Sequence, residues 1–203
     1  TADWHIGNKL HDIDRSEEFK NFFAWLKEKI FEEKAGSLIV AGDIFDTVNS
    51  SVEARTLFFE FLASLINSSC KNIVIVAGNH DSGAMLEISK DLLKFFNIHI
   101  VGNYSNSSIE DVVFELFAED GSVEGICCAV PFVKELELKN LLDSEVEEGS
   151  IANESYGIIY KQVLDAAKSL RGERDIPIIA TGHLYASNLE GRLSNCNPTE
   201  KTD

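Results

Sequence analysis

The sequence is poor in positive charge. Among its 203 residues, 18 are Lys or Arg and 34 are Asp or Glu, so the formal net charge at pH 7 is −16. A molecule of this sign repels polyanions over most of its surface. The composition therefore excludes nucleic-acid binding through overall basic charge. Such a role would need a local patch, bound metal ions or a partner.

The sequence also lacks a cysteine pattern and any long hydrophobic run. Its four cysteines show no C-x-x-C spacing, and Cys127 and Cys128 are adjacent within an apolar stretch, which is typical of buried strand residues. A reducing cytoplasm is the simplest environment for such thiols. Because no apolar run approaches the ~18 to 20 residues of a membrane helix, we expect neither a membrane span nor an export leader.

Four short polar motifs are present, each beside an apolar run. An Asp, a His or an Asn lies beside a strand by accident in most sequences, but four such accidents in series are improbable. Taken singly, Asp43 is more often a turn former, and His183 is more often a core histidine. The motifs are Asp3-Trp4-His5, Gly42-Asp43-Ile44-Phe45-Asp46, Gly78-Asn79-His80-Asp81 and Gly182-His183-Leu184.

The first half of the chain alternates between helix and strand patterns. Apolar residues at helical spacing predict helices over residues 16–34, 52–66 and 85–96, with Ser16 as the N-cap of the first. Runs rich in β-branched residues predict strands over 37–41 and 72–77, and a polar motif follows each of them. This order indicates a layered α/β fold.

The second half changes to short strands. Residues 112–118 and 125–130 flank a turn-forming Glu-Asp-Gly, which predicts a hairpin in a second sheet. A long helix is expected over 152–170, followed by a strand over 177–180 that leads to Gly182-His183. The acidic stretch 135–148 is interpreted as a solvated helix or loop, and 188–203 as an exposed loop.

The polar motifs carry the donor atoms of a two-metal centre. Asp3 and His5 are one residue apart, so one divalent ion could take both. Asp43 is the candidate for bridging two ions held ~3.5 to 4 Å apart. Asn79 offers a neutral carbonyl oxygen and His183 an imidazole nitrogen. This mixed O/N set suits manganese or iron, and we favour manganese.

His80 is predicted to act on the substrate and not on a metal. It cannot easily bind the same ion as its neighbour Asn79, and Asp46 is expected to lie near enough to orient it. A histidine so placed suits a transition-state donor or a general acid to the leaving oxygen. Two ions would clamp a phosphodiester and lower the pKa of a bridging water. The expected reaction is metal-assisted phosphoester hydrolysis.

These motifs resemble those of the calcineurin-like metallophosphoesterases, whose signature is D-x-H, G-D-x-x-D, G-N-H-D/E, G-H and G-H-x-H. The first four occur here in order across essentially the whole chain. More narrowly, the wording resembles bacterial nuclease subunits that work with an ATPase. The matching segments are Thr1–Gly7, Gly42–Thr47, Ala54–Leu57, Gly78–Ser82, Pro131-Phe132 and Ala180–Leu184.

The resemblance implies a fold, a site and partners. The fold is a four-layer α/β/β/α sandwich of two mixed sheets flanked by helices. The activity is manganese-dependent cutting of double-stranded DNA ends and hairpins in DNA repair, recombination and replication, by a homodimer with an ATPase partner. The implied catalytic pair is His80 with Asp46, and the implied metal ligands are Asp3, His5, Asp43, Asn79 and His183.

The chain departs from the family signature because G-H-x-H is absent. We therefore expect residues 1–203 to be one nuclease domain that lacks its first strand and its C-terminal G-H-x-H part. Two other functions stay open. One is hydrolysis of a small-molecule phosphodiester or phosphate, which would suit the acidic surface. The other is a catalytically weak interaction module, although a scaffold would have no need of both His80 and Asp46.

Overall fold

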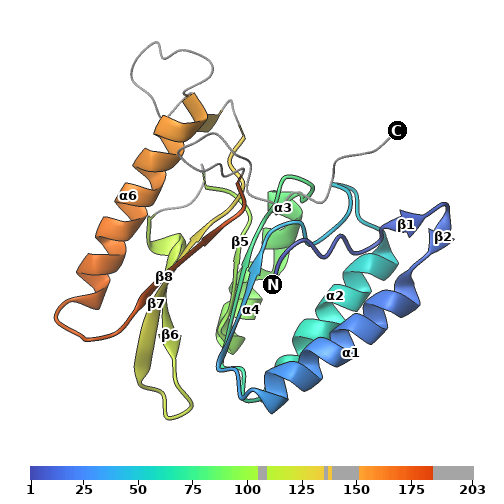
Figure 1. The fold of residues 1–203 in the computed structure, drawn as a ribbon, viewed down its shortest axis with the longest axis horizontal. Coiled ribbons are helices and arrows are strands. Elements are labelled where there is room, and N and C mark those ends of the chain that lie inside the picture. Colours follow the sequence, from blue (N-terminus) through green and yellow to red (C-terminus); the bar gives the residue numbers. More distant parts are fainter. Residues whose placement is uncertain (105–108, 135–136, 139–150, 185–203) are drawn as a thin grey trace, which may run out of the picture.

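The computed structural model describes residues 1–104, 109–134, 137–138 and 151–184. Figure 1 shows four layers, in which two helices, two sheets and one helix follow one another across the molecule. The helices of the outer layers are α1 (Ser16–Glu32), α2 (Val52–Leu65) and α6 (Ile151–Arg171). The expected α/β/β/α sandwich is confirmed.

The first sheet has the order β3-β4-β5 and is wholly parallel in the part of the chain that is described. Its strands are β3 (Ser37–Ala41), β4 (Asn72–Val76) and β5 (Ile98–Val101). All five residues of β4 are buried. Ile73 and Ile75 face the core beneath α1 and α2, whereas Val74 and Val76 face the second sheet. Burial on both faces explains the unbroken apolar run.

The second sheet is mixed and has the order β6-β7-β8. β6 (Val113–Phe117) and β7 (Val123–Val130) form the predicted antiparallel hairpin, and β8 (Ile178–Gly182) pairs in parallel with β7. Cys127 and Cys128 of β7 are buried as expected. Burial raises the pKa of Cys127 to about 12, which makes this thiol unreactive.

The first helix begins as predicted, but Ser16 is not its N-cap. Arg15 occupies the cap position without a side-chain cap bond, and the Ser16 N–H instead donates to the Asp14 carboxylate at 3.0 Å. α2 has the expected kind of cap, since Ser51 Oγ accepts from the Ala54 N–H at 3.1 Å. No described helix has the length and apolar character needed to cross a membrane.

The single helix predicted over residues 85–96 is wrong. The segment comprises two α-helical turns, α3 (Gly83–Leu86) and α4 (Lys90–Leu93), interleaved with 3-10 turns over Glu87–Ser89 and Lys94–Phe96. The Glu87 carboxylate accepts from the N–H groups that follow β5, at 2.8 Å from Gly102 and 3.2 Å from Asn103. This tertiary tie overrides local helix propensity.

Two further elements were not predicted. One is the strand β5, and the other is a small antiparallel hairpin of β1 (Lys9–Leu10) and β2 (Ile13–Asp14). A four-residue strand and two-residue strands carry too little periodicity to be found from sequence. The expectations for residues 135–148 fall largely outside the described residues, and those for 188–203 wholly so.

Candidate metal centre

The polar motifs meet at the carboxyl ends of the parallel strands. β3 leads to Asp43, β4 to Asn79 and β8 to His183. The N-terminal segment runs alongside the end of β3, because the N–H groups of Asp3 and His5 donate to the carbonyls of residues 42 and 43, each at 3.0 Å. In open α/β sheets, ligands bind at this edge.

The backbone at the site adopts the left-handed conformation at three ligand candidates. Asp3, His5 and Asp43 have φ values of 55°, 48° and 50°. Each such non-glycine residue costs roughly 1–3 kcal/mol and persists only where its surroundings hold it. Asp3 and His5 were expected in an extended segment or its loop continuation. The structure has the loop, and the hydrogen bonds to residues 42 and 43 hold it.

Asp43 lies at the middle of the cluster. Ligand atoms of Asp3, Asp43 and His183 all lie within 4.8 Å of one another. The Asp43 Oδ2 atom is 3.6 Å from His5 Nε2 and 3.5 Å from His183 Nε2. Asn79 joins them, since its Oδ1 is 3.0 Å from His183 Nε2. The structure thus brings together all five residues predicted as metal ligands.

The protonation of His183 indicates a cation site. Its Nδ1 is 2.9 Å from the Ala41 carbonyl oxygen, so in the neutral ring Nδ1 carries the proton and Nε2 presents a lone pair. That lone pair faces two oxygens, Asn79 Oδ1 at 3.0 Å and Asp43 Oδ2 at 3.5 Å. Acceptors that face one another repel unless a cation lies between them. Throughout the described chain, no lysine or arginine pairs with Asp3 or Asp43.

Two glycines allow this close approach. A Cβ at Gly42 would lie 2.2 Å from His183 Nδ1, and a Cβ at Gly78 would lie 2.1 Å from Asp43 Oδ1. Gly42 also has a φ of 87°, which disfavours any side chain. The glycines that open the G-D and G-N-H motifs are therefore required by side chains from other loops.

Asp81 ties two ligand loops together, a role that was not predicted from the sequence. Its buried carboxylate accepts from Ile44 N–H at 3.0 Å, Phe45 N–H at 2.9 Å and Gly78 N–H at 2.8 Å. Burial raises the pKa of Asp81, and the three donors act in the opposite direction. Its position at the end of the Gly78 motif is the only sequence signal for this role.

His80 lies at the exposed mouth of the site. Its backbone N–H donates to Asp43 Oδ1 at 2.9 Å, and its ring Nδ1 is 2.9 Å from the main-chain oxygen of Asp46. The Asp46 carboxylate has other partners: it accepts from Asn8 Nδ2 at 2.9 Å and lies 3.5 Å from His5 Nδ1. His80 and Asp46 are neighbours as predicted, but the contact with the ring comes from the main chain.

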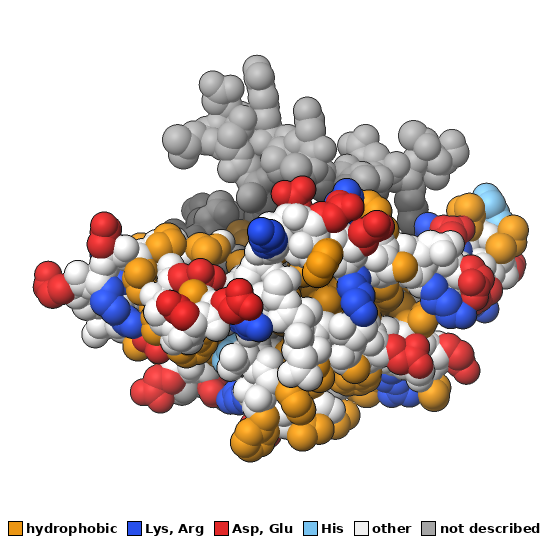
Figure 2. All heavy atoms as spheres, turned by 90° about the horizontal axis from the view of Figure 1, so that it is seen from below, with side chains coloured by type: hydrophobic (Ala, Val, Ile, Leu, Met, Phe, Trp, Pro, Cys, Tyr) orange, Lys and Arg blue, Asp and Glu red, His pale blue; other side chains and the backbone are white. Residues whose placement is uncertain are grey.

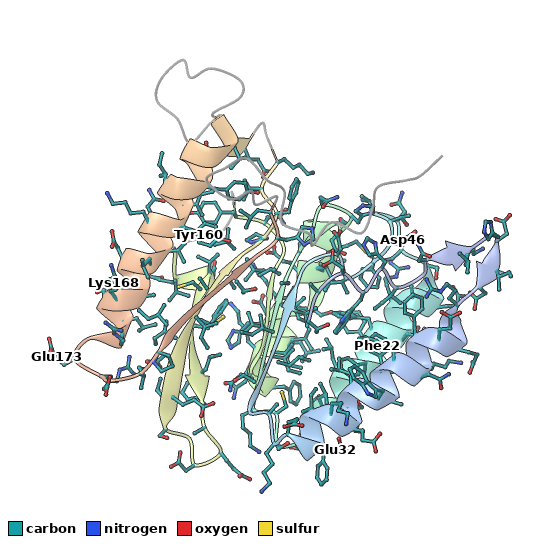
Figure 3. The ribbon with its side chains drawn as sticks, in the orientation of Figure 1. Phe22, Glu32, Asp46, Tyr160, Lys168 and Glu173 are labelled. Carbon is teal, nitrogen blue, oxygen red and sulfur yellow. The ribbon has the colours of Figure 1, made fainter. Side chains whose placement is uncertain are left out.

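The basic residues near the motifs are engaged by neighbours. Arg15 pairs with Glu18 at 2.7 Å, and Lys90 lies 3.6 Å from Glu87. Arg55 contacts the sulfur of Met85 at 3.3 Å. The expected ion pairs are thus present for Arg15 and Lys90, and neither residue is a free phosphate contact. Figure 3 places Asp46 on the side of the molecule where the strands of the first sheet end.

Comparison with known proteins agrees with this geometry. Residues 1–196 match the calcineurin-like phosphoesterase family, and the chain belongs to that family. Within it, the chain resembles SbcD. It is 33% identical over 189 residues to the SbcD subunit of the nuclease SbcCD from Escherichia coli (strain K12), which covers 91% of this chain and 45% of that protein.

Two other relatives with the same name give similar values. The protein of Rhodobacter capsulatus is 32% identical over 198 residues, covering 94% of this chain and 48% of the relative. The protein of Bacillus subtilis (strain 168) is 29% identical over 187 residues, covering 92% and 46%. The chain thus spans about half the length of the curated relatives it matches.

Proposed function

We propose that this chain is the catalytic part of a metal-dependent DNA nuclease of the SbcD type, with residues 1–203 forming its metallophosphoesterase domain. The observation that carries the proposal is the convergence of acceptor atoms on Asp43. A histidine lone pair, an amide oxygen and carboxylate oxygens share one site without a basic side chain to balance them. Such a donor set fits divalent cations, and its mixture of oxygen and nitrogen favours manganese.

The ligands divide around Asp43. Asp3 and His5 would hold one ion, Asn79 and His183 the other, and Asp43 would bridge the two. Two bound ions would supply Lewis acidity to the phosphodiester and lower the pKa of a water between them. The protein's own contribution is to keep these donors in fixed positions, and Asp81 supports it by joining the two loops.

His80 is the group that would meet the substrate. Its ring is exposed, and the contact from Nδ1 to the Asp46 carbonyl leaves Nε2 as the atom available to a bound phosphodiester. In the protonated ring, Nε2 could donate to the developing charge or to the leaving oxygen. Asp46 belongs to the catalytic pair through its main chain, which orients the imidazole.

DNA affinity would come from metals and a partner. With a net charge of −16, the chain has too little basic surface to hold a duplex alone. Figure 2 shows Lys and Arg side chains interspersed with acidic ones over the face seen there. The relatives are named as one subunit of SbcCD, which supports an SbcC-type ATPase partner and a substrate of double-stranded DNA ends and hairpins. A role in DNA repair, recombination and replication in the cytoplasm follows from the same likeness.

Exposed apolar side chains support a homodimer. Ile88, Leu92 and Phe95 are 76%, 63% and 85% exposed, and their spacing places them along one stretch of the segment between β4 and β5. Apolar residues in such a row favour burial against a second copy of the chain. Leu92→Asp is expected to convert a dimer to monomers in light scattering, while Lys134→Asp, a change of charge elsewhere on the surface, leaves the mass unchanged.

The direct test of the nuclease proposal is manganese-dependent cleavage of a linear duplex and a hairpin by the full-length protein with its ATPase partner. Wild type is compared with His80→Ala and Asp43→Ala. Cleavage by wild type and its loss in both variants is the expected result. A wild type that hydrolyses a small aryl phosphodiester but cuts neither DNA would overturn it in favour of a small-molecule phosphodiesterase.

A further inference from the structure

Asp46 addresses two histidines of the site through two different groups. Its main-chain oxygen lies 2.9 Å from Nδ1 of His80. Its carboxylate turns the other way, and Oδ1 lies 3.5 Å from Nδ1 of His5. The two histidine rings are edge to face, with centroids 4.9 Å apart. The Asp46 side chain therefore faces the histidine proposed as a metal ligand, and its backbone faces the histidine proposed to meet the substrate.

A carboxylate in this place sets which nitrogen of His5 is free. When Asp46 accepts the Nδ1 proton, the neutral ring presents its lone pair at Nε2. That atom is 3.6 Å from Asp43 Oδ2, on the side of the proposed metal centre. A carboxylate behind a metal-binding histidine fixes the tautomer and ring orientation and raises the basicity of the ligand.

Asn8 holds the carboxylate in this position. Its Nδ2 donates to Asp46 Oδ1 at 2.9 Å, and its Oδ1 accepts from Arg15 Nη1 at 3.4 Å. These partners fix the amide orientation, because only the NH₂ end can donate to a carboxylate and only the oxygen can accept from a guanidinium.

The backbone and the arginine are themselves held. The Asn8 N–H donates to the His5 carbonyl at 3.0 Å, and Gly7 turns the chain between them with a φ of 94°. Arg15 is fixed in the first turn of α1 by two contacts with Glu18, both 2.7 Å. The chain of contacts thus runs from α1 through Asn8 and Asp46 to His5.

We infer that Asn8 is a positioning residue of the metal centre, which keeps the Asp46 carboxylate against His5 so that Nε2 of His5 faces the ion. The inference rests on the proposed function, since it concerns the same centre. It assigns the Asp46 side chain to metal binding and the Asp46 main chain to the orientation of His80. Removing the Asn8 amide should therefore weaken metal binding without removing any ligand.

The test is Mn²⁺ affinity, measured by electron paramagnetic resonance of the free ion during titration of the full-length protein. Asn8→Ala and the nearly isosteric Asn8→Leu are expected to weaken the tighter site about 10-fold, within the range for loss of an outer-shell partner. Asn49→Ala, a matched change at an exposed asparagine near the same loop, should stay within about twofold of wild type, since no metal-site contact is lost. Thermal unfolding in EDTA is measured alongside.

A double-variant cycle shows whether Asn8 acts through Asp46. If it does, Asn8→Ala combined with Asp46→Ala loses no more affinity than Asp46→Ala alone. Additive losses, an unchanged affinity in both Asn8 variants, or loss of the metal-free fold in both would overturn the inference while wild type still binds Mn²⁺. A wild type that binds no Mn²⁺ would instead overturn the proposed function, and the inference with it.

Discussion

The two sheets contribute unequally to the metal centre. The first sheet and the N-terminal segment beside it supply Asp3, His5, Asp43 and Asn79, whereas the second sheet supplies only His183. Parallel strands end at one edge, so β3 and β4 place their loops together. The β6–β7 hairpin is antiparallel and its strands end at opposite edges, so only the parallel strand β8 delivers a ligand. Strand direction decides which half of the molecule builds the site.

The halves also differ in backbone strain and in how their loops are anchored. Within the described residues, every non-glycine residue with positive φ lies at or before Asn97. The first motif is anchored by Trp4, whose ring packs edge-on against Phe23 at 5.1 Å and Phe61 at 5.6 Å. The last motif rests on Tyr160, whose hydroxyl would be 2.0 Å from a Cβ at Gly182. Figure 3 shows Tyr160 between α6 and the second sheet.

Removing the aromatic anchor tests the first half most strongly. Trp4→Ala is expected to lower the free energy of unfolding by about 3–5 kcal/mol, because it deletes a buried ring between α1 and α2. Urea unfolding of the metal-free protein measures it. Tyr160→Phe, the counterpart in the second half, keeps the ring and should cost less than about 1 kcal/mol. Equal losses would mean that the halves are anchored alike.

A matched pair of glycines separates backbone strain from contact with the site. Gly42 and Gly121 have φ values of 87° and 82°, but only Gly42 has a ligand against it, since nothing lies within 4 Å of a Cβ at Gly121. Gly121→Ala should cost about 1 kcal/mol of unfolding free energy. Gly42→Ala should cost about 2 kcal/mol and also weaken Mn²⁺ binding. Equal effects on both measurements would show that His183 does not press on Gly42.

The smallest expected effect concerns the boundary between the sheets. His99 of β5 stacks on Phe114 of β6 with ring centroids 4.2 Å apart, and burial lowers its pKa to about 4. Because the folded pKa lies below the unfolded value of 6.5, the contribution is present above pH 6.5 and is lost as pH falls toward 4.

The variant His99→Gln removes this titration. Wild type should therefore lose on the order of 1 kcal/mol more unfolding free energy than His99→Gln between pH 8 and pH 6. Urea unfolding at the two pH values measures the difference. Parallel losses in both proteins would show that His99 is not held neutral between the sheets.

The parts of the fold that are local in sequence were predictable, and those that depend on distant contacts were not. The strand 37–41 was predicted residue for residue, because a run buried on both faces needs no tertiary information. The break in the helix predicted over 85–96 depends on Glu87 meeting the chain after β5. No pattern within the segment records that contact.

The same distinction holds at the site. Motif wording alone brought together the five ligand candidates, because parallel strands end at one edge of a sheet. The roles of Asn8 and Asp81 depend on atoms that lie 38 and 36–37 residues away in sequence, at Asp46 and at Ile44 and Phe45. The pairing of Asp46 with His80 was predicted between side chains, and the main-chain contact depends on the course of a loop.

Anomalous diffraction from manganese-soaked crystals of the full-length protein tests the central claim most directly. The account predicts two peaks roughly 3.5–4 Å apart, one on each side of the Asp43 carboxylate. The first should lie against Asp3 and His5 from the first half, and the second against Asn79 and His183, where the two halves meet. No peak within coordination distance of Asp43, or ions held only at sites remote from it, would contradict the account.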